Sequence, residues 1–311
     1  MDITVAICTW NRANLLAQTL ARLESLEIPS DLSWELVVVN NCCTDDTDSV
    51  LADYESRLPI KRVFEEKAGH SNARNCAIDH ALGELIVWTD DDVLVSPRWL
   101  VEYKEASRRY PDSQFFGGPI RPWFEGTPPG WLKPLISKYG YVYALRDFGN
   151  RSFCFDKLKI PFGANFAIRA ETQRAFRYDP NRGRKRKGMM GTDETTVLHA
   201  ILEAGGSGVW IPSACVDHFI PKSRQSIGYL FAFFRGCGQC EAMHETDGGA
   251  PMLFGKPRWL WRQTIDAAFR FYTSRFVSRS EVWCEQLEKF GCYCGHLSSR
   301  REDGASAGTE K

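Results

Sequence analysis

Three adjacent aspartates, Asp90, Asp91 and Asp92, are the residues of this sequence that point most directly to a chemical function. They follow a strand-like run, residues 85–89. Neighbouring carboxylates repel one another, and a bound hard cation relieves that repulsion. Oxygen ligands favour Mg²⁺ or Mn²⁺ over zinc. The alternative is an acidic turn at the start of the next helix, where the helix dipole favours anions.

Polar residues also follow two earlier strand-like runs, residues 3–8 and 36–39. These polar residues are Thr9, Asn11 and Arg12 after the first run, and Asn40 and Asn41 after the second. Because the carboxyl ends of parallel strands share one edge of an open sheet, ligands collect there. We therefore expect these residues to lie with the aspartates around a bound nucleotide.

The segments that would position these residues alternate between strand and helix. Strands are expected at residues 3–8, 36–39, 61–64 and 85–89, and helices at 15–26, 46–54, 71–82 and 97–109. This order predicts an α/β fold with a doubly wound, mostly parallel sheet. Residues 117–135 are rich in Pro, Gly and Trp and are expected to be irregular. Short strands at 166–169 and 208–211 would flank a helix at 193–204, and helices would dominate from residue 226.

Composition excludes several classes of protein. Hydrophobic residues make up 43% of the 311, so a large core can form. The formal net charge is zero, which argues against a nucleic-acid-binding protein. No apolar run is long enough to span a membrane, and the first residues do not resemble a signal peptide. We therefore expect a cytoplasmic protein with its 11 cysteines reduced, free in solution or peripheral at the inner face of the membrane.

Several motifs, taken in order along the chain, resemble family 2 glycosyltransferases of the GT-A fold. They are residues 5–12 (VAICTWNR), 38–45 (VVNNCCTD), 69–75 (GHSNARN), 83–92 (GELIVWTDDD), 163–169 (GANFAIR) and 191–194 (GTDE). The resemblance covers about residues 1–220. It implies a Rossmann-like mixed sheet and transfer of a sugar from a nucleoside diphosphate sugar, most simply a UDP-sugar, to a hydroxyl group of a glycan or lipid-linked acceptor. The resemblance also implies that the reaction belongs to polysaccharide synthesis and that it inverts the anomeric centre by a single displacement.

The resemblance also implies roles for residues of the nucleotide-sugar half. Thr9, Asn11 and Arg12 would line the base and ribose pocket, and Asn40 or Asn41 would contact the base, although the family usually has Asp where this chain has Asn40. Arg74 and Asn75, at a helix start, would meet the phosphates. Asp90–Asp92 would be the DXD motif, with Asp92 on the metal and Asp90 or Asp91 on the ribose. His218 would complete the metal site or be structural.

The acceptor side is expected farther along the chain. Asp193 would be the general base that removes the proton of the acceptor hydroxyl, with Glu194 in reserve; both could equally be favourable charges at a helix start. Gly163, Ala164 and Asn165 would face the sugar. Residues 181–188 carry five cations and two glycines. They would form either a lid over the donor phosphates or an anionic acceptor, or a solvated loop.

We predict a GT-A domain over residues 1–225, with its nucleotide-sugar half at about 1–115 and its acceptor half at about 116–225. A helical extension would follow at 226–297 and a disordered tail at 298–311. The aromatic and Arg-rich region 226–283 would pack on the catalytic domain or lie on a membrane surface. The cysteines of 237–240 and 292–294 would be either thiols or zinc ligands.

Other functions fit the same residues less well. A sugar nucleotidyltransferase would need a Gly-rich basic loop after the first strand, and a dinucleotide oxidoreductase would need G-x-G-x-x-G there. Neither is present in residues 9–12. A catalytically silent glycan- or nucleotide-binding protein on the same fold is the remaining alternative, and Asp90–Asp92 together with Asp193 argue against it.

Overall fold

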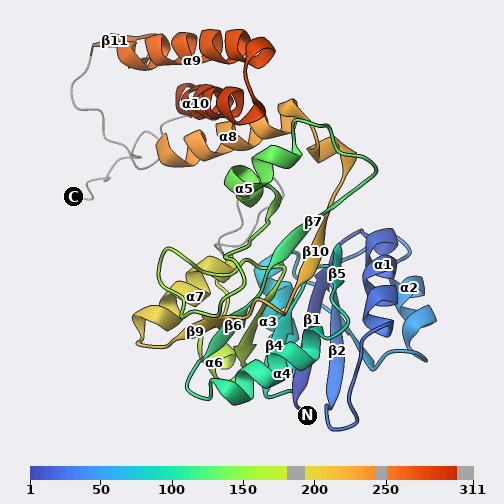
Figure 1. Ribbon diagram of the computed structural model, residues 1–311. Helices are drawn as coiled ribbons and strands as arrows, with labels where there is room; N and C mark the ends of the chain where they lie inside the picture. Colours follow the sequence, from blue (N-terminus) through green and yellow to red (C-terminus); the bar gives the residue numbers. More distant parts are fainter. Residues whose placement is uncertain (181–192, 243–250, 300–311) are drawn as a thin grey trace, which may run out of the picture. The chain divides into compact units, whose positions relative to one another are not determined.

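The computed structural model describes residues 1–180, 193–242 and 251–299 (Figure 1). The chain divides into two compact units. Unit 1 contains residues 1–124 and 143–220, and unit 2 contains residues 125–142 and 221–311. Segment 125–142, from the expected acceptor half, thus groups with the C-terminal helices. The domain boundary at residue 225 stays a prediction.

Within the described residues, seven strands of unit 1 form one mixed sheet in the order β3-β2-β1-β4-β8-β6-β9. The strands are β1 (Ile3–Thr9), β2 (Trp34–Asn40), β3 (Ile60–Phe64), β4 (Leu85–Trp88), β6 (Phe115–Gly117), β8 (Phe166–Arg169) and β9 (Gly208–Trp210). The first four are mutually parallel, whereas β8 runs antiparallel to both of its neighbours. The expected mostly parallel α/β sheet is therefore confirmed.

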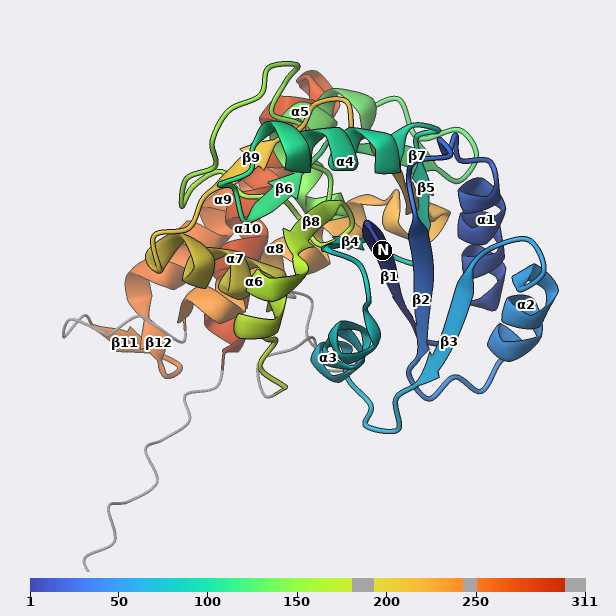
Figure 2. The same ribbon diagram turned by 90° about the horizontal axis from the view of Figure 1, so that it is seen from below.

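Helices cover both faces of this sheet. They are α1 (Ala13–Glu24), α2 (Thr47–Tyr54), α3 (His70–His80), α4 (Trp99–Arg109), α6 (Ala170–Ala175) and α7 (Asp193–Glu203). In α1 the buried residues Leu16, Leu20 and Leu23 recur at helical spacing. Figure 2 shows α3 and α4 on opposite sides of the sheet.

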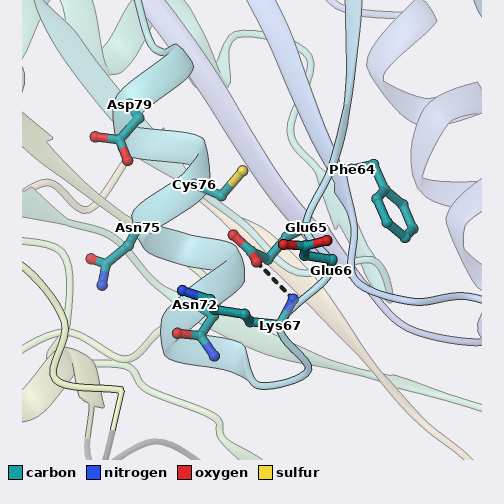
Figure 3. A pocket seen from close by; sticks show the side chains of 8 residues that line it. All are labelled: Phe64, Glu65, Glu66, Lys67, Asn72, Asn75, Cys76 and Asp79. Atoms are coloured by element: carbon teal, nitrogen blue, oxygen red, sulfur yellow. Dashed lines mark hydrogen bonds between the residues drawn. The ribbon is translucent and has the colours of Figure 1, made fainter.

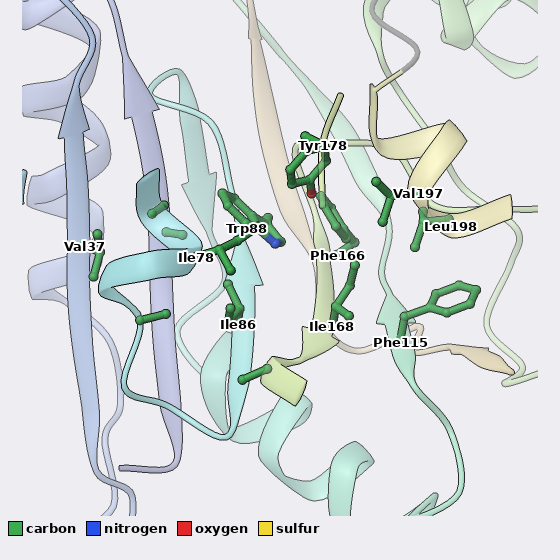
Figure 4. Packing of buried hydrophobic residues seen from close by; sticks show 14 of the residues in the cluster. Val37, Ile78, Ile86, Trp88, Phe115, Phe166, Ile168, Tyr178, Val197 and Leu198 are labelled. Atoms are coloured by element: carbon green, nitrogen blue, oxygen red, sulfur yellow. The ribbon is translucent and has the colours of Figure 1, made fainter. Parts of the chain in front are cut away.

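The hydrophobic core beneath α3 also extends under α6 and α7 (Figure 4). Ala6 of β1 faces this core, and its neighbours Val5 and Ile7 are equally buried on the other face. Burial of both faces explains why the central strands read as continuous apolar runs. These strands and the α3 core hold the sheet edge that carries the polar residues.

A second sheet of three strands stands beside the first, in the order β5-β10-β7. It consists of β5 (Val93–Val95), β7 (Ile120–Phe124) and β10 (Val216–Ile220). The expectation of an irregular segment at 117–135 was therefore wrong for its first part. Pro122 lies in β7, which is an edge strand of this sheet, where a missing N–H donor is tolerated.

Unit 2 is helical. Its elements are η1 (Lys133–Leu135), α5 (Ile136–Tyr139), η3 (Lys222–Arg224), α8 (Ile227–Ala242), a hairpin of β11 (Met252–Leu253) and β12 (Lys256–Pro257), α9 (Arg258–Val277) and α10 (Ser280–Ser298); η2 (Gly140–Tyr143) joins it to unit 1. Trp131 packs edge-on against Trp283 of α10, with ring centroids 5.5 Å apart. Trp131 therefore contributes to the core of unit 2. No helix in the described ranges is long and apolar enough to cross a bilayer.

Candidate active site

Strand pairing brings the aspartates and His218 together. The chain leaves β4 at Trp88, passes through Asp90–Asp92 and enters β5, which runs antiparallel to β10. In that pairing His218 lies opposite Val93, and the Phe219 N–H donates to the Asp92 carbonyl at 2.9 Å. His218 therefore lies inside strand β10 (Val216–Ile220). Its Nε2 lies 3.5 Å from Asp92 Oδ1.

These residues could hold a metal ion. One ligand atom each from Asp90, Asp92 and His218 lie within 4.8 Å of one another. Asp92 Oδ1 and His218 Nδ1 are buried and have no hydrogen-bond partner among the described residues. Buried polar atoms without partners are costly, and a cation would satisfy the carboxylate oxygen. Two carboxylates and an imidazole fit Mn²⁺ or Mg²⁺.

Arg12 and Thr9 bind both carboxylate oxygens of Asp91 and the second oxygen of Asp92. Arg12 Nη1 donates to Asp91 Oδ1 at 3.0 Å and to Asp92 Oδ2 at 2.8 Å, and the Thr9 hydroxyl donates to Asp91 Oδ2 at 2.8 Å. Burial raises the pKa of Asp91 to about 7, with Arg12 acting to lower it and Asp92 acting to raise it. Arg12 thus pairs with two of the three adjacent carboxylates, and a group of like charges of this kind favours added positive charge.

The residues after β2 are engaged in shaping their own loop. The Asn40 amide donates to Asp48 and accepts from the Cys43 N–H. The Asn41 amide donates to two carbonyls of residues 65–67 and accepts from the Gly69 N–H. Asn11, with φ 53°, accepts from the Thr44 N–H. The expected base contacts of Asn11, Asn40 and Asn41 stay predictions, and the structure gives these side chains a role in ordering the loop.

Arg74, on α3, is buried and forms an ion pair with Glu194. It is 3% exposed, Nη1 lies 3.4 Å from Glu194 Oε2, and its guanidinium lies over the ring of Tyr178. A Cβ placed on Gly163 would lie 2.8 Å from Arg74 Nη2 and 3.0 Å from Glu194 Oε1. Because Gly163 has no side chain, the Arg74–Glu194 ion pair can lie directly against its backbone.

Asp193, at the start of α7, lies against the start of α3. The Ser71 hydroxyl donates to Asp193 Oδ2 at 3.0 Å, and His70 Nδ1 lies 3.6 Å from the same oxygen. Asp193 Oδ1 is buried without a hydrogen-bond partner in the described chain. Burial acts to raise the pKa of Asp193, but the His70 hydrogen bond and the charge of Arg74 outweigh it and lower the pKa. The carboxylate is thus kept ionised, with one oxygen left over.

The side chains of two predicted site residues, Asn75 and Asn165, make hydrogen bonds to other parts of the chain. The Asn75 amide makes a hydrogen bond to each backbone polar group of Tyr178. Asn165, 0% exposed, accepts from Trp99 Nε1 and Tyr103 Oη and donates to two backbone carbonyls. Their expected contacts with phosphate and sugar stay predictions. Ala164 offers its carbonyl to the Thr89 hydroxyl at 3.1 Å, which ties the loop at 163–165 to the end of β4.

Sequence reasoning missed three supporting residues. His70 and Ser71 hold Asp193, and Thr19 of α1 bonds both the Asp91 carbonyl and the Val93 N–H. His70 and Ser71 stand in the motif at 69–75, so their place at a helix start was a usable signal. Thr19 gave none, because it is one polar residue on a helix face.

A separate hollow of about 450 Å³ lies between the end of β3 and α3 (Figure 3). Glu65, Glu66 and Asp79 line it together with Lys67, whose N–H bonds Glu65. This excess of negative charge disfavours a diphosphate, so we do not place the donor there. The basic segment 181–188, expected as a lid or loop, lies outside the described residues. In the part of the chain that is described, no group of three or more potential metal ligands includes a cysteine.

Comparison with known proteins shows the family to which the chain belongs. A family model described as glycosyl transferase family 2 matches residues 4–175, more than half of the chain. The chain belongs to glycosyl transferase family 2. The resemblance read from the motifs is thereby confirmed, and the protein is a glycosyltransferase.

Curated relatives include the succinoglycan biosynthesis protein ExoM of Rhizobium meliloti, which is 25% identical over 74% of this chain and 71% of its own length. A validoxylamine A glucosyltransferase of Streptomyces hygroscopicus subsp. limoneus is 30% identical over 51% of this chain, but only 35% of its own length is matched. The match to this second enzyme therefore covers a minor part of it.

Solved structures share the fold. A mannosyltransferase of Pyrobaculum calidifontis, in complex with GDP-Man and Mn²⁺, superposes with a TM-score of 0.58 at 20% identity, covering 95% of this chain and 87% of that one. A Staphylococcus aureus TarS fragment in complex with UDP gives a TM-score of 0.51 at 15% identity, covering 96% and 91%. Both are similar in fold, which establishes the GT-A fold here.

Proposed function

We propose that this glycosyltransferase moves a sugar from a nucleoside diphosphate sugar, with UDP as the expected nucleotide, to a hydroxyl group of a glycan or lipid-linked acceptor in polysaccharide synthesis. The observation that supports this proposal most strongly is the grouping of Asp90, Asp92 and His218, whose ligand atoms lie within 4.8 Å of one another at the sheet edge. The GDP-Man and Mn²⁺ bound by a structural neighbour and the UDP bound by another support the donor class.

Asp92 and His218 would hold Mn²⁺ or Mg²⁺, with Asp90 beside them. When bound, the cation supplies positive charge that stabilises the departing diphosphate. Arg12 bonds Asp92 Oδ2 and leaves Oδ1 free of hydrogen bonds within the described residues. The Arg12 side chain is 38% exposed, so its outer part can also face the donor.

Asp193 would act as the general base. Its Oδ2 is held by Ser71, which leaves Oδ1, an oxygen with no hydrogen-bond partner among the described residues, to accept the proton of the acceptor hydroxyl. As the proton moves, the acceptor oxygen bonds to the anomeric carbon and the bond from that carbon to the diphosphate oxygen breaks. Attack from the face opposite the leaving group inverts the anomeric centre. Glu194 is paired with Arg74, which makes it the weaker candidate for this role.

The test is turnover of a panel of UDP-, GDP- and dTDP-sugars with Mn²⁺, read as release of nucleoside diphosphate. We expect one donor class to be consumed, and Asp92→Asn to lower turnover at least about 100-fold. Asp112→Asn, an exposed aspartate of the same unit, is the matched control and should match the wild type. Absence of turnover with every donor would indicate the silent binding protein, and an active Asp92→Asn would refute the site.

A further inference from the structure

Helix α9 of unit 2 has apolar side chains on two faces. One face is buried and carries Leu260, Thr264, Ala267 and Phe271. A second face carries Ile265, Phe269, Tyr272 and Phe276, which recur at the same spacing and are 68%, 67%, 56% and 81% exposed. At about 100° per residue, the offset of five residues puts the two faces about 140° apart.

The buried face already has its partner. Helix α10 packs against both α9 and α8, and Figure 1 shows α10 between them. A helix that packs through one face is expected to be polar elsewhere. We call the exposed residues Ile265, Phe269, Tyr272 and Phe276 the outer stripe. Most of the large hydrophobic side chains exposed in the described chain lie between residues 252 and 282, in and around this stripe.

The hairpin before α9 extends the same apolar surface. Phe254, at its tip, is 85% exposed, and Met252 and Leu253 are exposed beside it. The Phe254 ring lies 6.0 Å from the ring of Trp261, and Trp261 Nε1 donates to the Leu253 carbonyl at 2.9 Å. The hairpin is therefore fixed to the first turns of α9.

The charge around the outer stripe is strongly positive. Residues 258–279 contain five arginines and one aspartate, although the whole chain has a formal net charge of zero. The arginines are exposed: Arg258, Arg262, Arg270, Arg275 and Arg279. Asp266 is bonded to Arg270 at 2.8 Å, so it leaves the other four arginines uncompensated by a residue of this helix. An apolar stripe flanked by arginines complements an apolar layer bordered by anions.

We propose that α9 and the β11–β12 hairpin dock unit 2 on the surface of an anionic phospholipid membrane. The outer stripe and Phe254 would enter the boundary of the acyl chains, and the flanking arginines would meet lipid phosphates. A second copy of the chain complements this surface less well, because a two-fold contact through α9 would set arginines against arginines. The segments 243–250 and 300–311 are polar in sequence, so they offer little apolar surface to cover the stripe.

The test is co-sedimentation of the full chain with vesicles. We expect binding to phosphatidylcholine vesicles that contain about a third phosphatidylglycerol, weaker binding in 0.5 M salt, and little binding to pure phosphatidylcholine. The double variant Phe269→Ser with Phe276→Ser should lower the partition coefficient at least about tenfold, and Arg262→Glu about fivefold. Leu158→Ser is the matched control, because Leu158 is 90% exposed in unit 1.

Several results would overturn the proposal. They are failure of the wild type to bind the anionic vesicles, equal loss of binding in Leu158→Ser and in the double variant, or salt-insensitive binding. Light scattering is run in parallel. A wild-type dimer that dissociates in the double variant, with no vesicle binding, would assign the stripe to a second copy. Urea unfolding shows whether the double variant is still folded, so that a loss of vesicle binding is not mistaken for a loss of folding. A folded double variant that binds the vesicles as well as the wild type would also refute the proposal.

Discussion

Replacing His218 by alanine tests the metal site directly. The imidazole is one of three candidate ligands, and it is neutral when it binds a metal, so His218→Ala keeps both carboxylates and their attraction for cations. The variant therefore removes coordination while leaving the charge of the site unchanged. We expect Mn²⁺ affinity to fall about 100-fold.

The expected size of the effect follows from linkage. Mn²⁺ at 100 times its dissociation constant stabilises the folded protein by about 2.7 kcal/mol, and a 100-fold loss of affinity reduces this to about 0.4 kcal/mol. Unit 1, residues 1–124 and 143–220, is a domain of the size for which 1 kcal/mol moves the midpoint by about 2–4 °C. The Mn²⁺-induced rise in Tm should thus fall from about 5–11 °C to about 1 °C.

The assay is thermal unfolding of the full chain, read at the transition of unit 1, with Mn²⁺ and with a chelator. The midpoint measured with chelator is the metal-free reference. The difference between the two midpoints is the readout, so any damage to the metal-free fold cancels. His199→Ala is the control, because His199 lies on α7 and is not one of the three candidate ligands. An Mn²⁺ shift in His218→Ala equal to that of the wild type would refute the reasoning and leave His218 a structural residue.

Three further predictions concern the acceptor side. Asp193→Asn should lower transfer about 10²–10⁴-fold while donor affinity, measured by calorimetry, stays unchanged; normal transfer would remove Asp193 from the mechanism. The lowered pKa of Asp193 keeps it ionised until the pH falls through that pKa, and His70→Ala should move the acid limb of the rate profile to higher pH; an unmoved limb contradicts the contact. Asn165→Ala should destabilise unit 1 by about 3 kcal/mol or more in urea, because it strands four buried partners; a neutral effect would contradict the structural role of these hydrogen bonds.

The sequence sufficed for much of the fold because local patterns encode local structure. The strand expected at 36–39 lies within β2, and the helix expected at 15–26 overlaps α1. Short elements were harder. Strand β7 contains Pro122 and lies in a Pro-rich segment, so composition favoured an irregular chain; only its place at a sheet edge makes that proline acceptable.

The amino-acid sequence by itself determined which residues end the parallel strands, and hence that Asp90–Asp92 lie with Thr9 and Arg12 on one edge. That follows from the period of the side chains and the direction of the strands, which are local properties. Tertiary structure alone decided that His218 reaches Asp92 and that Ser71 holds Asp193. Both contacts join residues far apart in the chain, so they depend on the β5–β10 register and on the packing that brings α7 to α3, and neither is written in any local pattern.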